Sequence, residues 1–212
     1  MKLLTSNAKI DKSIKLFPEY EATILQMLPS KQMCVNYKDC ISKCLAFTGF
    51  AKIYKSVNKS RKAKTDFFLN DNRNFVIQIV KEIRNQIKRA IKKNKIAIVR
   101  LNGFTDVNWD KILFEGKTIF ELFPDVIFWD YTADFNKLIS NRNPNYHLTF
   151  SYKGNNDKET FEAMKQDFNI AVIDTIENRD KWFNKLPAID GDLHDFRFLD
   201  TDNSVVWLKF KK

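Results

Sequence analysis

Beyond Lys95 the sequence alternates between short apolar runs and stretches of helix length. Because the apolar runs are nearly continuous, each predicted strand is expected to be buried on both faces. This alternation predicts an α/β fold built on a parallel sheet covered by helices. The expected strands are 96–103, 125–132, 146–152, 169–175 and 204–210, with a short one at 188–192, and the helical stretches between them are 135–141, 158–168 and 178–186.

The chain contains neither of the two glycine-rich phosphate loops, G-x-G-x-x-G or G-x-x-x-x-G-K-[ST]. Such a loop is typical of open, doubly wound sheets that bind nucleotides. We therefore expect a partial (β/α) barrel with parallel strands. In that architecture, chemistry collects at the carboxyl ends of the strands.

The first 94 residues are predicted to be mainly helical. Residues 17–28 read as a short helix that ends at Pro29, and residues 74–94 as a long amphipathic helix with one apolar and one basic face. A chain of 212 residues with 44% hydrophobic residues is most simply one domain. Its helical part, 1–94, carries the cysteines and a basic segment, and 95–212 carries the β/α strands.

Polar residues gather at the predicted carboxyl ends of the strands. Many such residues only cap helices or form turns. Arg100 and Asp130 lie within apolar runs, however, where a buried charge needs a partner or a ligand. An Arg100–Asp130 ion pair with no functional role is the alternative. The residues expected to line a pocket for a cofactor or substrate are Arg100, Asn102, Asp130, Tyr131, Ser151 and Asp192.

The segment AIDGDLHDFRFLD, 188–200, is the densest in polar groups. In extended chain, Asp190, Asp192 and His194 would point to one side, as ligands of Mg²⁺ or a similar cation do. Gly191 permits a tight turn instead, and a structural turn is the favoured interpretation of this segment, with the cation site and an electrostatic contact to a bound cofactor as alternatives.

All three cysteines of the chain, Cys34, Cys40 and Cys44, lie within eleven residues. Cys40 and Cys44 are four apart, which on a helix places both thiols on one face. An odd number of cysteines argues against a disulfide framework. Zn²⁺ needs four ligands and no fourth lies nearby, whereas a [4Fe-4S] cluster held by three cysteines keeps one iron open. We expect a cluster, with Zn²⁺ or an inert set of small core residues as alternatives.

Two basic segments accompany a net charge of +10. Residues 52–64 carry six basic residues and no acidic one, and the helix 74–94 has a basic face. Such charge attracts phosphates, so nucleic acid is an alternative partner, with Lys62 and Arg89 as candidate contacts. A solvated helix face is the simpler interpretation. The sequence predicts neither a membrane span nor a signal peptide, and a cytoplasmic location is expected.

The chain resembles the uncharacterised phage gene-product-eighty-eight family. The resemblance rests on the C-x5-C-x3-C spacing of the cysteines followed by LAFTG, and on RLNGFTD, FWDYTAD, YHLTFS and IDGDLHDFRFLD. It runs from about Leu28 to the C-terminus. It implies a phage or prophage-carrying bacterial host and little about chemistry.

The layout is also similar, more distantly, to radical S-adenosylmethionine enzymes. In these, three cysteines near the start of a partial β/α barrel hold a [4Fe-4S] cluster whose open iron binds the cofactor. The spacing there is usually C-x3-C-x2-C, from which this chain departs. The similarity implies S-adenosylmethionine as a cofactor and radical chemistry on an unidentified substrate. We expect that substrate to be a small molecule or to bear a phosphate. The alternative function is a nucleic-acid-binding accessory protein whose cysteine site holds zinc or no metal.

Overall fold

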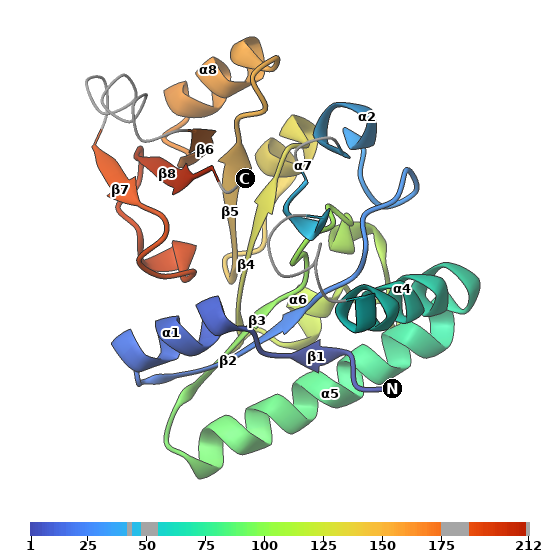
Figure 1. Ribbon diagram of the computed structural model, residues 1–212. Helices are drawn as coiled ribbons and strands as arrows, with labels where there is room; N and C mark the ends of the chain where they lie inside the picture. The colour runs from blue at the N-terminus through green and yellow to red at the C-terminus, as the bar shows by residue number, and fades with distance from the viewer. Residues whose placement is uncertain (42–43, 48–54, 175–186, 211–212) are drawn as a thin grey trace.

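The computed structural model of the protein is built on one sheet, which has eight strands in the described residues (Figure 1). The structure describes residues 1–41, 44–47, 55–174 and 187–210. The strands lie in the order β1-β2-β3-β4-β5-β6-β8-β7, with β1 antiparallel to β2 and all other neighbours parallel. Their bounds are β1 Leu4–Thr5, β2 Tyr20–Leu25, β3 Ile96–Arg100, β4 Ile127–Thr132, β5 Tyr146–Ser151, β6 Ile170–Asp174, β7 Ala188–Asp190 and β8 Val205–Lys209.

Helices of very different length connect these strands. Within the described ranges, the α-helices are α1 Ala8–Leu16, α2 Tyr37–Cys40, α4 Lys55–Asn70, α5 Asn72–Lys92, α6 Ile119–Leu122, α7 Phe135–Ser140 and α8 Asp157–Lys165. Short 3-10 turns occur at Leu45–Phe47, Trp109–Lys111 and Arg197–Leu199. No helix among the described residues is both long enough and apolar enough to cross a membrane.

The α/β class and the strands expected beyond Lys95 are confirmed, each within a few residues. The helices expected at 74–94, 135–141 and 158–168 are present as α5, α7 and α8. The helix expected at 178–186 lies outside the described residues.

Two predictions for the N-terminal part are wrong. Residues 17–28 do not form a helix, because Tyr20–Leu25 is the strand β2, paired in parallel with β3. Five of its six residues are buried, as in a central strand, although Glu21 and Thr23 are polar, and periodicity alone does not distinguish so short a segment from a helix. The helix α2 ends at Cys40, so Cys44 does not share a helical face with it.

One face of the sheet packs against α5. The side chain of Asp71 caps the start of this helix by accepting a hydrogen bond from the Asn74 backbone N–H, at 3.3 Å. The apolar side of α5 buries Phe75, Val76, Ile79, Val80 and Ile83 against Ala97, Val99 and Leu101. Its opposite side stays in solvent, and this leaves the basic face of α5 exposed.

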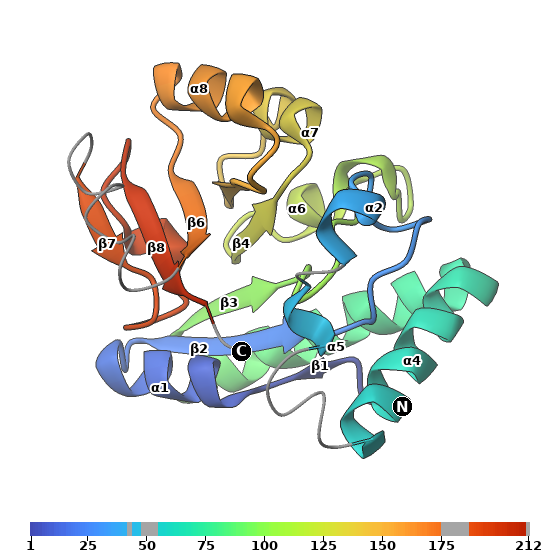
Figure 2. The ribbon, with the colours of Figure 1, turned by 45° about the horizontal axis from the view of Figure 1, so that its top comes forward.

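The other face of the first strands is covered by α1 and by the segment that follows β7. Figures 1 and 2 place α1 and α5 on opposite faces of β2. Phe196 is fully buried there, and its ring lies 5.7 Å from that of Tyr20 and 5.5 Å from that of Trp129. The chain beyond β7 thus returns to the start of the sheet and fills this face.

Truncating Phe196 tests this packing. We expect Phe196→Ala to lower the free energy of unfolding by about 3–5 kcal/mol, because it leaves a cavity among aromatic rings. Phe161, on α8, is 57% exposed, so Phe161→Ala should cost less than about 1 kcal/mol. Urea titration measures both, and equal losses would contradict the packing of the 193–200 segment.

Candidate functional site at the carboxyl ends of the strands

The carboxylate of Asp130, in β4, is fully buried at the end of the sheet where β3 and β4 finish. It accepts hydrogen bonds from the backbone N–H of Asn102 at 2.7 Å, from the Asn102 side-chain amide at 3.1 Å, and from the Tyr146 hydroxyl at 3.0 Å. Burial raises the pKa of Asp130 to about 6, although nearby cations and these hydrogen bonds oppose the shift. This carboxylate links the segment after β3 to the first residue of β5 across β4.

Arg100, the last residue of β3, lies between two carboxylates. Its Nη1 is 2.7 Å from Asp195, which follows β7, and its Nε is 3.8 Å from Asp130. Lys9, from α1, lies 3.3 Å from the other oxygen of Asp195. Burial alone would raise the pKa of Asp195, but the charges of Arg100 and Lys9 hold it below its usual value. The expected Arg100–Asp130 contact exists, but Asp195 is the closer partner.

The phenol of Tyr131 lies against this ion pair. The Arg100 guanidinium is 4.9 Å from the centre of its ring. The hydroxyl is buried and finds no hydrogen-bond partner within the described chain. Burial also raises the pKa of Tyr131 far above its usual range, so the phenol stays protonated at neutral pH. It is therefore a buried donor available to a ligand.

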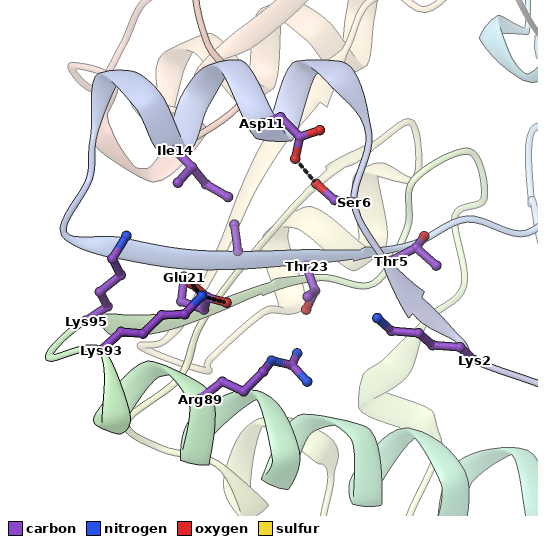
Figure 3. Close-up of a pocket in the computed structure, with 11 residues that line it drawn as sticks. Lys2, Thr5, Ser6, Asp11, Ile14, Glu21, Thr23, Arg89, Lys93 and Lys95 are labelled. Carbon is purple, nitrogen blue, oxygen red and sulfur yellow. Dashed lines mark hydrogen bonds and ion pairs between the residues drawn. The ribbon is translucent and has the colours of Figure 1, made fainter.

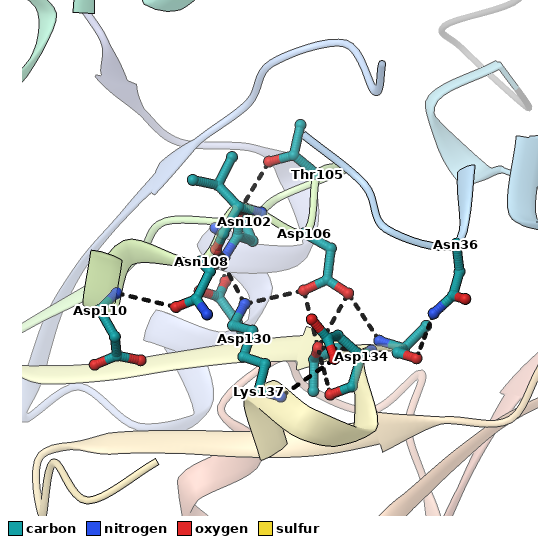
Figure 4. Close-up of polar contacts among 12 residues, drawn as sticks. Asn36, Asn102, Thr105, Asp106, Asn108, Asp110, Asp130, Asp134 and Lys137 are labelled. Atoms are coloured by element: carbon teal, nitrogen blue, oxygen red, sulfur yellow. Dashed lines mark hydrogen bonds and ion pairs between the residues drawn. The ribbon is translucent and has the colours of Figure 1, made fainter. Parts of the chain in front are cut away.

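A second network surrounds Asp106, in the loop after β3 (Figure 4). Its carboxylate lies 2.9 Å from the ammonium group of Lys137 and accepts hydrogen bonds from the Thr132 hydroxyl and the Ala133 backbone N–H, both at 2.9 Å. Lys137 is 1% exposed and also donates to the Val107 carbonyl at 3.1 Å. These contacts fix the loops that follow β3 and β4.

The cysteine segment lies across these same loops. The Asn36 amide donates to the Ala133 carbonyl at 2.6 Å, and Figure 4 shows Asn36 beyond Asp106, at the right of the view. Cys34 lies near Asp106, whose backbone N–H favours the thiolate and partly opposes the rise in the pKa of Cys34. Asp39 lies 3.9 Å from Lys153, which follows β5. The segment is thus held against the carboxyl ends of β3, β4 and β5.

The three thiols are partly buried and protonated. Burial raises the pKa of Cys34 to about 11 and also raises the pKa of Cys40 and of Cys44. A charge on Cys44 would raise the pKa of Cys34 and of Cys40 further, so Cys44 lies within electrostatic range of each of them. Over the described ranges, no three His, Cys, Asp or Glu side chains form a group that could hold a metal ion.

The pocket residues expected from sequence divide into two sets. Arg100, Asn102, Asp130 and Tyr131 form one connected cluster. Ser151 ends β5, where its carbonyl accepts a hydrogen bond from the Asn156 amide at 3.1 Å. Asp192 accepts a hydrogen bond from the Lys209 backbone N–H at 2.9 Å, beside the end of β8.

The segment 188–200 forms a turn rather than an extended row of ligands. Asp190 accepts a hydrogen bond from the Asp192 backbone N–H at 2.9 Å, and β7 ends there. The His194 ring lies 3.0 Å from Arg197, and burial lowers the pKa of His194 to about 4, with help from the Arg197 charge. The favoured interpretation of this segment, a structural turn at Gly191, is therefore confirmed, and Asp190, Asp192 and His194 do not form an extended row.

Sequence reasoning did not select Lys9, Lys137 or Asp195 for this site. The lysines gave no signal, because lysine is usually exposed. Asp195 lies in the polar segment 188–200. It could have been recognised as a partner of Arg100, because a buried arginine needs an acidic partner.

The two candidate nucleic-acid contacts lie apart from these strand ends. Lys62, on α4, is 2.6 Å from Asp66 one turn further along the same helix. Its neighbours Arg61 and Lys64 are engaged inside the protein, donating to the carbonyls of Ala46 and Leu3. Arg89, on α5, lines a separate pocket near β1 and β2. Residues 52–54 of the basic run lie outside the described residues.

Comparison with known proteins gives one match. The model of the family described as Gene product 88 matches residues 1–212. No curated protein and no solved structure matches the chain.

Removing the charge of Arg100 tests the buried cluster. Arg100→Met leaves Asp195 and Asp130 without their shared cation, and we expect a loss of about 3–5 kcal/mol in the free energy of unfolding at about pH 7. The pKa of Asp130, already raised to about 6, then rises further, and Asp195, left with Lys9 as its cation, has a higher pKa than in the wild type. Groups with raised pKa values stabilise the folded state in acid, and this stabilisation disappears as the pH rises through those pKa values. The decrease in the free energy of unfolding caused by Arg100→Met should therefore be smaller at about pH 5 than at about pH 7.

Arg73→Met is the matched control, because Arg73 is exposed on α5. It should change stability by less than about 0.5 kcal/mol at either pH. Urea titrations of wild type and both variants give the comparison. A loss for Arg100→Met that is small, or that does not depend on pH, would contradict the assigned ion pair.

Proposed function

The chain belongs to the Gene product 88 family over residues 1–212, and from this premise we propose that it binds an iron–sulfur cluster through Cys34, Cys40 and Cys44. The observation that carries the proposal is the position of the cysteine segment. Contacts of Asn36 with Ala133 and of Cys34 with Asp106 hold it against the carboxyl ends of β3 and β4. In parallel α/β folds, ligands bind at this end of the sheet.

The strand order supports the same location for a ligand. From β2 to β6, neighbours in the sheet are also neighbours along the chain, and all of them are parallel. A doubly wound sheet instead reverses direction near its middle. A strand order that runs in one direction over five strands favours the partial (β/α) barrel. The cysteine segment follows the first parallel strand, which is also its place in the radical S-adenosylmethionine layout.

The donor set fits a cluster better than zinc. Three thiols from one segment suit a [4Fe-4S] cluster, and no fourth protein ligand accompanies them in the described ranges. The thiols do not already surround a single point, so the segment would have to close when a cluster binds. All three carry raised pKa values, so cluster binding would also release their protons.

The neighbouring polar cluster would bind the small molecule. Two cations, Arg100 and Lys9, and two carboxylates, Asp130 and Asp195, leave it with no formal net charge. The buried Tyr131 hydroxyl beside them makes no hydrogen bond to the described residues, and neither does the Nε of Arg100, so both could donate to the ligand. When bound, a cluster of this type supplies one iron without a protein ligand, and S-adenosylmethionine is the first molecule to test there. Ser151 and Asp192 would line the outer part of the pocket.

Reconstitution under anaerobic conditions tests the proposal. Wild-type protein supplied with iron and sulfide should hold about four of each per chain and absorb in the visible through thiolate-to-iron charge transfer. The variant Cys34→Ala/Cys40→Ala/Cys44→Ala should hold neither. Its thermal stability, measured in parallel, shows whether it still folds. Zinc without sulfide in wild type would contradict the cluster and support the zinc alternative, and a folded wild type that takes up no metal would contradict both.

The protonation of Cys34 gives a second prediction. With Cys40→Ala/Cys44→Ala, Cys34 is the only thiol left in the chain. Its pKa of about 11, against 9.0 for an ordinary thiol, corresponds to about a hundredfold less thiolate at about pH 8. Alkylation of the folded variant by iodoacetamide should therefore be at least a hundredfold slower than alkylation of the same variant in concentrated urea. Equal rates would show that the thiol is neither buried nor shifted.

A further inference from the structure

A second polar pocket lies far along the sheet from the cysteines, between α1, β2 and the end of α5 (Figure 3). It has a volume of about 420 Å³, within the range of small-molecule sites. Four cations line it, namely Lys2, Arg89, Lys93 and Lys95. The cysteine site and its polar cluster contribute no residue to it.

The charges in this pocket are only partly balanced. Lys93 lies 3.0 Å from Glu21, so these two neutralise each other. Among the residues with defined positions, neither Lys2, Arg89 nor Lys95 forms an ion pair with a carboxylate. The other acid of the pocket, Asp11, accepts a hydrogen bond from Ser6. An excess of positive charge therefore remains.

The pocket also contains a buried donor without a partner. Thr23, in β2, is only 7% exposed, and its hydroxyl makes no hydrogen bond to any described residue. Figure 3 shows the side chains of Thr23, Arg89 and Lys2 directed toward the same space between β2 and α5. A buried hydroxyl without a partner is costly unless a ligand or water satisfies it. A hydroxyl donor beside two cations suits a phosphate group.

The exposed face of α5 extends this positive surface. Lys81, Arg84, Lys88 and Lys92 are all exposed and recur at helical spacing. The one acidic residue of α5, Glu82, is turned away and accepts hydrogen bonds from the backbone N–H groups of Leu3 and Leu4. At about 1.5 Å per residue, the four cations span about 16 Å beside the pocket. That length accommodates more than one phosphate.

We propose that this pocket binds one phosphate of a single-stranded nucleic acid and that α5 carries the phosphates next to it. Thr23, Arg89 and Lys2 hold the inserted phosphate, and the row from Lys81 to Lys92 binds the flanking backbone. A single strand is favoured because its backbone can bend into a recess between a strand and a helix, whereas duplex phosphates lie on a rigid outer surface. The cations contact phosphates only, so binding is independent of base sequence.

Fluorescence anisotropy with a labelled single-stranded oligonucleotide tests the proposal. Arg89→Gln should weaken binding about tenfold and reduce the slope of log K against log salt by about 1. Thr23→Val keeps the shape and charge of the side chain, and we expect about fivefold weaker binding with an unchanged slope. Lys158→Gln, an equal loss of charge on α8, should leave affinity within about twofold of wild type. Thermal unfolding checks the fold of each variant, and Thr23→Val should be at least as stable as wild type.

Two further measurements identify the source of the phosphate. A labelled duplex should bind more weakly than the single strand at equal salt. Inorganic phosphate should raise the melting temperature of wild type more than that of Thr23→Val if the pocket holds a phosphate. If phosphate stabilises wild type more than Thr23→Val but the oligonucleotide does not bind, the nucleic-acid proposal is overturned. The pocket would then be assigned to a small phosphate-bearing molecule. If wild type, Thr23→Val and Lys158→Gln bind the oligonucleotide with equal affinity, the proposal that the pocket holds a phosphate is overturned. Binding would then come only from the net positive charge of the protein.

Discussion

The buried contact between Arg100 and Asp195 joins parts of the chain that lie 95 residues apart. Arg100 ends β3 near the start of the sheet, and Asp195 follows β7 at its far edge. A buried cation without a carboxylate is strongly destabilising, so the segment after β7 has to return across the sheet to satisfy it. Phe196, the next residue in this segment, packs on the apolar face of the sheet beside Trp129. One ion pair and one ring thus determine what covers this face of the sheet.

The same ion pair also sets the electrostatics of the strand ends. Asp195 is shared with Lys9 of α1, and Arg100 with Asp130 of β4, so four charged groups from four parts of the chain compensate one another. Asp130 in turn binds Asn102 and Tyr146, and this fixes the end of β3 against β4 and β5. Because each charged group has a partner, the cluster is rigid without being strongly attractive to any ion. The Tyr131 hydroxyl and the Nε of Arg100 are its donors without a hydrogen bond to the described residues.

Continuous apolar runs made most strands predictable from sequence, and helical spacing did the same for α5. The strand β2 was missed because a short buried run has no period that separates a strand from a helix. Its place depends on pairing with β3, which begins more than seventy residues later. Arg100 and Asp130 were recognised as charges needing partners, but which acid meets Arg100 is decided by the path of the chain after β7. Lys137 was not recognised, because nothing in its neighbours shows that it binds Asp106 in the interior.

The distribution of charge separates the two proposed sites. At the carboxyl ends of the strands, Lys9, Arg100 and Lys137 are matched by Asp195, Asp130 and Asp106, so this region contributes nothing to the formal charge of +10. The excess lies elsewhere, and α5 presents an exposed row of it with no acid on the same side. A polyanion would therefore approach the α5 face rather than the strand ends, where the charged groups compensate one another. Because α5 covers one face of the sheet and the cysteine segment crosses the strand ends, both ligands could be bound at once without sharing a residue.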